Sequence, residues 1–267
     1  MCAMDKNQLT SQDVKNLSKN LQTENKSVVA QKVSAYYNGH TVTPKGLRLA
    51  EDIFRIMVRD VEAKVRQVLA ESLKNTHNLP EDIVQSVIKD TDAVAVPFIK
   101  YYADLNAEDL IKILDIPSIN KQKAVAQRLN LPNEISEYIV ERCPEEVVGV
   151  LISNETANIH EKTYNTIVEK YRQSEDIKKR LVYRTELPTS VIEKIANSLS
   201  EDLKRRLILS HNLPADLATD IIEEVKEKTT LRISEDYSSD KQIEELVHQL
   251  YTSNRLTPNL VVLSICM

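Results

Sequence analysis

The chain has 267 residues, of which 42% are hydrophobic and 28% charged, so it carries enough apolar side chains to bury one extended core or two small ones. With 3 Gly, 9 Pro and 4% aromatic residues it lacks the turn residues that a β-sandwich or β-barrel needs, and its glycines, at Gly39, Gly46 and Gly149, cannot form a phosphate-binding loop. The formal net charge of −5 argues against a dedicated nucleic-acid binder, whose affinity depends on many cationic contacts to phosphate.

Residues 1–45 are predicted to form an N-terminal helical cap. Within it, Ser11–Tyr37 has apolar residues at irregular helical spacing, which indicates one or two helices. Thr41–Gly46 contains a proline and ends in a glycine, so we expect the joint between the cap and the following helices there. Ala50–Met57 and Val61–Leu73 then form a first amphipathic helix pair.

A short signature recurs along the rest of the chain: Leu-Pro, two mostly polar residues and an aliphatic residue. Its four copies begin at Leu79, Leu131, Leu187 and Leu213. These starts lie 52, 56 and 26 residues apart, and the two larger spacings are twice 26 and twice 28. Degenerate copies at the midpoints begin at Leu105 and Ile159, which gives six repeats with a period of 26–28 residues, from residue 79 to about 228.

Each copy of the signature has the features of a helix start. Proline is tolerated at the first helical position, where its missing N–H would have no intrahelical partner, and the acidic residues that follow favour the positive end of the helix dipole. Between successive copies there is room for one further helix of about ten residues. These second helices are predicted at Val94–Ala103, Asn120–Leu129, Glu145–Ser153, Glu175–Arg184 and Glu201–Ser210.

Two such short helices cannot bury their apolar faces alone, so neighbouring pairs must stack. The sequence therefore predicts an all-α fold, in which an α-solenoid, a right-handed superhelix of antiparallel helix pairs, spans residues 46–230. Residues 231–267 are predicted to form C-terminal helices, with an incomplete last repeat that begins at Leu256–Leu260. The apolar run Val261–Met267 would be exposed on an unpaired helix, so we expect a partner, a second copy of the chain in a homodimer, or additional chain to cover it.

The segment from Asp60 to Arg66, followed by Leu69-Ala70-Glu71, resembles the Asp, Val-Arg and Leu-Ala-Glu pattern of HEAT-like repeats. In those repeats an Asp and an Arg six residues later commonly bridge neighbouring turns, and Asp60 and Arg66 match that spacing. The order of segments from Leu79 through Ser200–Leu207 is similar to a family of uncharacterised bacterial HEAT-like proteins, a domain of unknown function. The resemblance implies a HEAT-like solenoid and brings no established catalytic residues.

Candidate chemistry is sparse in this sequence. Cys2, Cys143 and Cys266 lie far apart without metal-ligand spacing, which is typical of reduced thiols in a cytoplasmic protein. The tetrapeptide His-Asn-Leu-Pro occurs at His77 and at His211, where we expect a cap and turn rather than a metal or acid–base site. No apolar run approaches the length of about 18 residues that a membrane span needs. We therefore expect a cytoplasmic protein with no metal, no cofactor, no catalytic residues and no membrane contact.

Charge is predicted to differ between the two helix layers. The helices that begin at the signature carry acidic residues: Glu137, Glu141, Glu169, Glu193 and Glu223. The intervening helices carry basic residues: Lys178, Lys179, Arg180, Lys204, Arg205 and Arg206. Either both layers are solvated faces, or the acidic layer lines the concave side and binds a basic helix or peptide. The basic residues either hold an anionic ligand, or Arg180 and Arg206 bridge to carboxylates of neighbouring repeats.

Two functions follow from these features. The favoured interpretation is a non-enzymatic protein–protein interaction scaffold of bacterial regulation that binds a protein partner along its helical-repeat surface. The alternative is a nucleic-acid or nucleotide-binding helical-repeat protein that uses the basic cluster from Lys178 to Arg206. A helical-repeat DNA glycosylase is disfavoured, because the chain has no Trp to stack on an exposed base and its net charge is negative.

Overall fold

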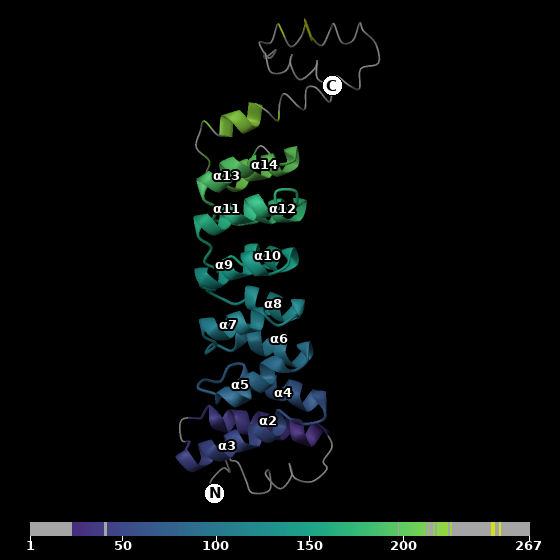
Figure 1. Ribbon diagram of the computed structural model, residues 1–267, viewed down its shortest axis with the longest axis vertical. Coiled ribbons are helices and arrows are strands. Elements are labelled where there is room, and N and C mark those ends of the chain that lie inside the picture. Colours follow the sequence, from purple (N-terminus) through teal and green to yellow (C-terminus); the bar gives the residue numbers. More distant parts are fainter. Residues whose placement is uncertain are drawn as a thin grey trace, which may run out of the picture. The chain divides into compact units, whose positions relative to one another are not determined.

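The computed structural model describes residues 23–39, 42–196, 198–211, 213, 216, 218–223, 225, 247, 248 and 251. Every regular element in these residues is a helix, which confirms the all-α prediction (Figure 1). The helices are α2 (Thr23–Tyr37), α3 (Pro44–Met57), α4 (Ala63–Leu73), α5 (Glu81–Lys89), α6 (Asp92–Tyr101), α7 (Ala107–Leu114), α8 (Ile119–Ala126), α9 (Asn133–Arg142), α10 (Glu145–Ile152), α11 (Glu161–Lys170), α12 (Glu175–Tyr183), α13 (Thr189–Ala196) and α14 (Glu201–Ser210). The chain divides into two compact units, residues 1–163 and 164–267, which are described separately below.

The predicted helix pairs are present. A helix begins at each of the first five copies of the signature, including the degenerate copies that precede α7 and α11. The intervening helices α6, α8, α10, α12 and α14 lie where they are predicted, and α14 has the predicted bounds. The largest difference among them is α8, which ends at Ala126 instead of Leu129 because the chain turns there toward Asn130, whose φ of 52° is not helical.

Two of the signature prolines that the structure describes, Pro80 and Pro132, lie one residue earlier than predicted. Pro80 and Pro132 are N-cap residues, with φ of −56° and −62° and extended ψ of 138° and 150°, and the first helical residue follows each of them. The Pro80 carbonyl accepts hydrogen bonds from the N–H groups of Ile83 and Val84, at 3.0 and 3.2 Å. An N-cap residue needs no helical N–H of its own, so proline is accommodated at this position as well.

The start of α3 corrects the predicted joint at Thr41–Gly46. The helix begins at Pro44, six residues before the predicted Ala50, because Thr43 acts as its N-cap and accepts a hydrogen bond from the Gly46 N–H at 3.1 Å. Gly46 therefore lies inside the first turn. A Cβ atom at this position would lie 2.0 Å from the hydroxyl oxygen of Tyr36, so the glycine serves close packing of the two helices.

The helices of the first unit form two layers (Figure 1). In the second-helix layer α2, α4, α6, α8 and α10 pack one against the next, and in the first-helix layer α3 contacts α5 and α7 contacts α9. Each helix contributes a narrow apolar stripe, as in α5, where Ile83, Val84, Val87 and Ile88 are buried. In the second unit α12 packs against α14 in the same way.

The predicted N-terminal cap, residues 1–45, contains α2, which packs against α3 and α4 as a further member of the stack, and the first two residues of α3. Residues 1–22, 40 and 41 of the cap lie outside the described residues. So do Leu256–Leu260 and Val261–Met267, on which the predictions of an incomplete last repeat and of a homodimer depend.

Asparagines in left-handed backbone conformation precede two copies of the signature. Asn78 and Asn130 have φ of 56° and 52°. The Asn78 N–H donates to Oδ2 of Asp104 at 2.6 Å, and the Asn130 N–H donates to Oγ1 of Thr156 at 3.1 Å. Each acceptor lies 26 residues further along, so the turn before one helix pair is bonded to the turn before the next. This confirms the predicted turn role of the His-Asn-Leu-Pro segment at residue 77.

We expect replacement of Asn130 by alanine to lower the free energy of unfolding by about 1 kcal/mol, because a left-handed backbone is costly for residues other than glycine and asparagine. Asn130→Gly keeps that conformation accessible and should unfold at a urea concentration close to that of the wild type. Urea unfolding followed by circular dichroism measures both variants, and equal losses in the two would show that backbone conformation is not the cause.

Candidate functional site

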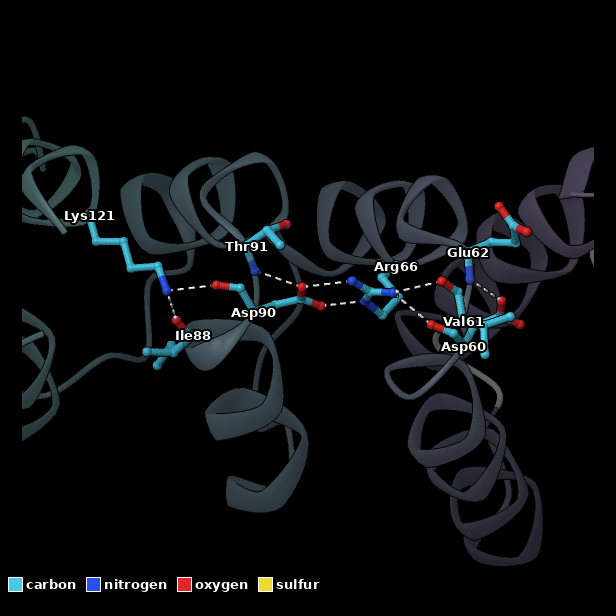
Figure 2. A network of polar contacts seen from close by, with 8 residues as sticks. All are labelled: Asp60, Val61, Glu62, Arg66, Ile88, Asp90, Thr91 and Lys121. Atoms are coloured by element: carbon cyan, nitrogen blue, oxygen red, sulfur yellow. Dashed lines mark hydrogen bonds and ion pairs between the residues drawn. The ribbon is translucent and has the colours of Figure 1, made fainter. Parts of the chain in front are cut away.

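A chain of polar contacts joins the helix starts of the second-helix layer in the first unit. We call its members, Lys26, Asp60, Arg66, Asp90 and Lys121, the cation ladder, and Figure 2 shows it from Asp60 to Lys121. Lys26 Nζ on α2 lies 2.7 Å from Oδ2 of Asp60, just before α4. Arg66 on α4 donates from Nε and Nη2 to the two carboxylate oxygens of Asp90, at 2.6 and 2.9 Å. Each contact links a helix of this layer to the loop before the next one.

The predicted contact between Asp60 and Arg66 is present in another form. Arg66 Nη1 donates to the main-chain oxygen of Asp60, at 2.7 Å, and not to its carboxylate. The carboxylate partner of Arg66 is Asp90, 24 residues later, so the bridge between neighbouring repeats runs forward along the chain. The spacing of six residues thus correctly predicted that Arg66 contacts Asp60, but the contact is with the main-chain oxygen of Asp60.

Asp90 lies at the centre of the ladder. Burial raises the pKa of its carboxyl, but hydrogen bonds from Arg66 and from the Thr91 N–H, together with the Arg66 charge, outweigh burial and bring the pKa below its usual value. The hydrogen bond with Asp90 raises the pKa of the Arg66 guanidinium in turn. The two side chains are 11% and 17% exposed, so this is an ionised and mostly buried pair.

Lys121 on α8 reaches the same loop from the other side (Figure 2). Its Nζ donates to the carbonyl oxygens of Ile88 and Asp90, at 2.9 and 2.7 Å. These carbonyls end α5, where no helical N–H remains to pair with them, so a cation is favourable there. The fourth residue of α6 is Ala95, whereas the fourth residue of α4 is Arg66. The loop before α6 is therefore bound by cations of both neighbouring helices, Arg66 of α4 and Lys121 of α8.

Similar polar contacts are made at the C-terminal ends of the helices in the second-helix layer. Arg128 donates to the Ile99 carbonyl at 2.5 Å, and Asn154 Nδ2 donates to the Ala126 carbonyl at 2.8 Å. In the second unit the His211 Nε2 lies 3.1 Å from the carbonyl of Val182. In all three contacts the side chain belongs to the helix pair after the one whose carbonyl it meets, so the last turns of α6, α8 and α12 obtain partners from their successors.

The structure divides the predicted basic cluster between interior and surface. Lys178 and Lys204 are the fourth residues of α12 and α14 and are 8% and 1% exposed, whereas Lys179, Arg205 and Arg206 are exposed. Lys178 Nζ donates to the Ser198 carbonyl in the next pair, at 3.0 Å. The outer surface of these helices is therefore less basic than predicted, because cations at the fourth helical position point inward as Arg66 does.

Arg180 contacts a carboxylate on its own helix, and Arg206 contacts an aromatic ring of the neighbouring repeat. Arg180 Nε lies 2.6 Å from Oδ2 of Asp176, four residues earlier on its own helix. The Arg206 guanidinium lies over the ring of Tyr183, 5.0 Å from its centre, and so contacts the neighbouring repeat through an aromatic ring. The bridge to the next pair is made by Lys178, two positions before Arg180.

The predicted acidic residues lie on the first-helix side of the pairs but share it with cations. Glu137 and Glu141 are on α9, Glu169 is on α11, Glu193 is on α13, and Glu223 belongs to a helical stretch at 218–223. Lys162 Nζ lies 2.9 Å from Oε1 of Glu137, and Lys194 Nζ donates to Asn165 at 2.7 Å. The hydrogen bond between Lys162 and Glu137 raises the pKa of the Lys162 ammonium group. The first helices therefore carry cations as well as these carboxylates, and a binding role for the acidic residues stays a prediction.

An exposed apolar position recurs at the ends of the second helices. The residue four positions before the signature leucine is Tyr101, Tyr183 and Leu209 in three of the pairs, with 51%, 54% and 82% of its surface exposed. In the second unit α12 packs against α14 and Arg206 covers the Tyr183 ring. Tyr183, Leu209 and Arg206 are thus exposed residues on two adjacent helices, and we call them together the α12–α14 end surface.

The remaining candidate residues from the sequence are the cysteines and His77. Cys143 is buried, and His77 Nδ1 lies 2.9 Å from Oδ1 of Asp104, whose carboxylate also accepts a hydrogen bond from the Asn78 N–H. Cys2 and Cys266 lie outside the described residues. Within the described part of the chain, no group of three His, Cys, Asp or Glu side chains is close enough to hold a metal ion.

Sequence reasoning missed the partners in the cation ladder and the donors at the helix ends. Asp90, Lys121, Arg128 and Asn154 do not belong to the signature and differ in type from repeat to repeat. One signal was available: a cation at the fourth helical position recurs as Arg66, Lys178 and Lys204. A charged residue on the inward side of a short amphipathic helix indicates a buried ion pair or a carbonyl contact.

Short helices in sequential pairs, packed in two layers and bonded from one pair to the next, define an all-helical protein with the packing expected of a helical repeat. A family model described as uncharacterised protein conserved in bacteria, DUF2336, matches residues 94–267. The chain belongs to this family, as its resemblance to an uncharacterised bacterial family suggested.

Other comparisons add little. No curated protein matches the chain. The crystal structure of an engineered protein is similar at 16% sequence identity, over 81% of this chain and 94% of that one, with a TM-score of 0.27. None of the helices among the described residues is long and apolar enough to cross a membrane.

We expect Asp90→Asn to lower the free energy of unfolding by about 2 kcal/mol, between the cost for an exposed pair and that for a fully buried one, because it leaves the Arg66 charge without its carboxylate. Asp52→Asn is a matched control, since Asp52 is 68% exposed, contacts Arg55 on the surface and should have little effect. Urea unfolding at pH 7 measures both.

The stability difference between wild type and Asp90→Asn should also depend on pH. Because the pKa of Asp90 in the folded state is depressed, its stabilising contribution is present above the ordinary value of 3.8 and is lost as the pH falls through the folded pKa. The two unfolding midpoints should therefore stay apart above pH 3.8 and converge as the pH falls below it. A difference that begins to shrink well above pH 3.8, or that does not shrink below it, would contradict a depressed pKa of Asp90.

Proposed function

We propose that this chain is a HEAT-like α-solenoid that acts as a non-enzymatic protein–protein interaction scaffold in the bacterial cytoplasm. In this proposal a protein partner binds along the outer surface of the helix pairs, and the α12–α14 end surface is its principal contact. The observation that carries the proposal is the exposed position four residues before the signature leucine, which holds a large apolar side chain in three pairs.

Two further observations support a binding surface there. Tyrosine and arginine are enriched in protein interfaces, where they contribute much of the binding energy, and Leu209 adds exposed apolar area on α14. Tyr183 is already held beneath the Arg206 guanidinium, so less side-chain entropy is lost when a partner covers it. A HEAT-like stack suits this role because equivalent positions of successive pairs form an extended surface.

The first test is a binding measurement with a partner identified from a native bacterial host by cross-linking and mass spectrometry. The double variant Tyr183→Ser/Leu209→Ser should bind the purified partner about 30-fold more weakly in calorimetry, because truncating an interface anchor costs about 2 kcal/mol. Val61→Ser is a suitable control, since Val61 is 89% exposed but belongs to the first unit and not to this surface.

The acidic residues give this test a second arm. If the partner is a basic helix that lies along the first helices, Glu137→Lys, Glu141→Lys and Glu193→Lys will weaken its binding and Tyr183→Ser/Leu209→Ser will not. That result would move the binding surface to the acidic residues and keep the scaffold function. Unchanged affinity in both sets of variants would refute binding along either surface.

Nucleic-acid binding is the second candidate, favoured by the exposed side chains of Lys179, Arg205 and Arg206 on the adjacent helices α12 and α14. We expect no retardation of a 20-nucleotide single strand or duplex in a mobility-shift titration at about 150 mM salt, because a few phosphate contacts bind weakly at that ionic strength. Retardation that Lys179→Glu/Arg205→Glu abolishes would support nucleic-acid binding in place of the scaffold.

A further inference from the structure

A cleft of about 370 Å³ lies between α11, α12 and α13 in the second unit. Apolar side chains form part of its wall: Val168, Ile177, Leu181 and Ile195. Its charged side chains are Glu169, Arg172, Lys178 and Lys194, so three cations face one carboxylate within the lining. Tyr171 and Ser198 complete the lining. The cleft is thus cationic, in a chain whose net charge is −5.

The first unit shows how the fold treats a cation at the corresponding place. Arg66, the fourth residue of α4, is matched by the carboxylate of Asp90 from the loop before the next second-layer helix. Lys178 is the fourth residue of α12, and its side chain is 10% exposed. The corresponding loop of the next pair offers it the main-chain oxygen of Ser198, and its carboxylate contact is Glu175, 67% exposed on its own helix.

The charge balance therefore differs between the two places. In the first unit a buried cation has a buried carboxylate from the neighbouring pair, whereas in the second unit the neighbour provides a neutral acceptor and a cleft lies beside it. Arg172 and Lys194 add two more cations to that cleft. A carboxylate entering it would complete the pattern that Asp90 completes in the first unit.

We propose that the cleft between α11, α12 and α13 binds an acidic side chain, aspartate or glutamate, from a segment of a partner protein in which that residue is flanked by aliphatic residues. The carboxylate meets Arg172, Lys178 and Lys194, and the aliphatic neighbours cover Ile177 and Ile195. This proposal rests on the scaffold function and gives the partner a chemical character.

The lining favours such a segment over other anions. A free phosphate would satisfy the cations but leave the apolar wall in contact with water. A nucleic-acid strand binds along a series of cations, with aromatic rings stacked on its bases. Among the described residues that line this cleft, Tyr171 is the one aromatic residue. An aliphatic residue beside a carboxylate matches both the charge and the apolar surface.

The test uses fluorescein-labelled synthetic peptides of nine residues with a central Asp or Glu between leucines and randomised ends, and the same peptides with a central Asn or Gln. The purified full chain is titrated into each pool, and fluorescence anisotropy is measured at about 150 mM salt. We expect the acidic pools to bind at least tenfold more tightly than the amide pools, as a charge-assisted hydrogen bond is stronger than a neutral one.

Variants connect this binding to the cleft. Arg172→Gln and Lys194→Gln should each weaken binding of the acidic pool about tenfold. Lys179→Gln is the matched control, because Lys179 is an exposed cation of α12 that does not line the cleft, and it should leave binding unchanged.

Ser198→Asp is the most specific variant. It introduces a carboxylate at a residue of the cleft lining whose main-chain oxygen already contacts Lys178, and it should abolish peptide binding. Ser198→Asn is the matched control: both variants lose the hydrogen bond from the Ser198 hydroxyl to the Ile195 carbonyl, and Ser198→Asn, without charge, should keep peptide binding. The Tm of Ser198→Asp should exceed that of Ser198→Asn by about 2 °C, and this measurement separates loss of binding from unfolding.

Three results would overturn the proposal: equal binding of the acidic and amide pools, acidic-pool binding that Ser198→Asp does not affect, and displacement of the peptides by inorganic phosphate at equal concentration. The scaffold function is tested independently through Tyr183 and Leu209. If the peptides fail to bind while the partner still depends on those two residues, the cleft proposal is wrong and the scaffold proposal stands. If the peptides bind as expected while no partner depends on Tyr183, Leu209 or the acidic residues, the cleft proposal stands, and the two outer surfaces are wrong as contacts of the scaffold.

Discussion

Cations buried between neighbouring helix pairs are the interaction on which this structure depends. The helices from α5 onward have only eight to ten residues each, and their apolar stripes provide stability that is not directional. Arg66 and Lys121 add direction, because a shift of one helix relative to the next would leave a charge in the interior without its partner. Apolar burial thus drives the stacking, and the buried polar contacts fix its register.

This arrangement also determines which groups remain available for binding. Lysines at the inward-facing fourth position contribute to the stack, so they do not add to the outer charge, and the outer faces carry both signs. What distinguishes one place on the surface from another is then a local departure from the repeating pattern. The α12–α14 end surface and the cleft beside Lys178 are two such departures, one in exposed apolar area and the other in charge balance.

The helix pairs could be predicted because their determinants are local. A leucine, a helix-starting proline and apolar residues three and four apart specify where a helix begins and which side is buried, and α14 has the bounds expected from these features alone. Thr43 and Pro44 are also a local start signal, but a segment that contains a proline and ends in a glycine is equally typical of a joint, and the predicted helix began six residues too late.

The polar contacts could be predicted less well because they depend on three-dimensional register. Asp90 is a neighbour of Arg66 only after two pairs have packed, and nothing in the chain around Asp90 indicates which cation it meets. The outward direction expected for Lys178 and Lys204 was wrong for the same reason, since both are buried: a lysine stem packs well against apolar surface, and the ammonium group of Lys178 reaches the Ser198 carbonyl. The cleft lining combines residues from three helices and has no counterpart in a linear pattern.

The short sequence distance between bonded groups has a consequence for how the protein is made. Arg128 meets a carbonyl 29 residues before it, and Asn130 meets a hydroxyl 26 residues after it. A chain with such a low contact order needs no distant segment to complete its first native contacts. As synthesis proceeds from the ribosome, each new pair finds its binding surface already formed by the pair before it, so assembly can follow translation step by step.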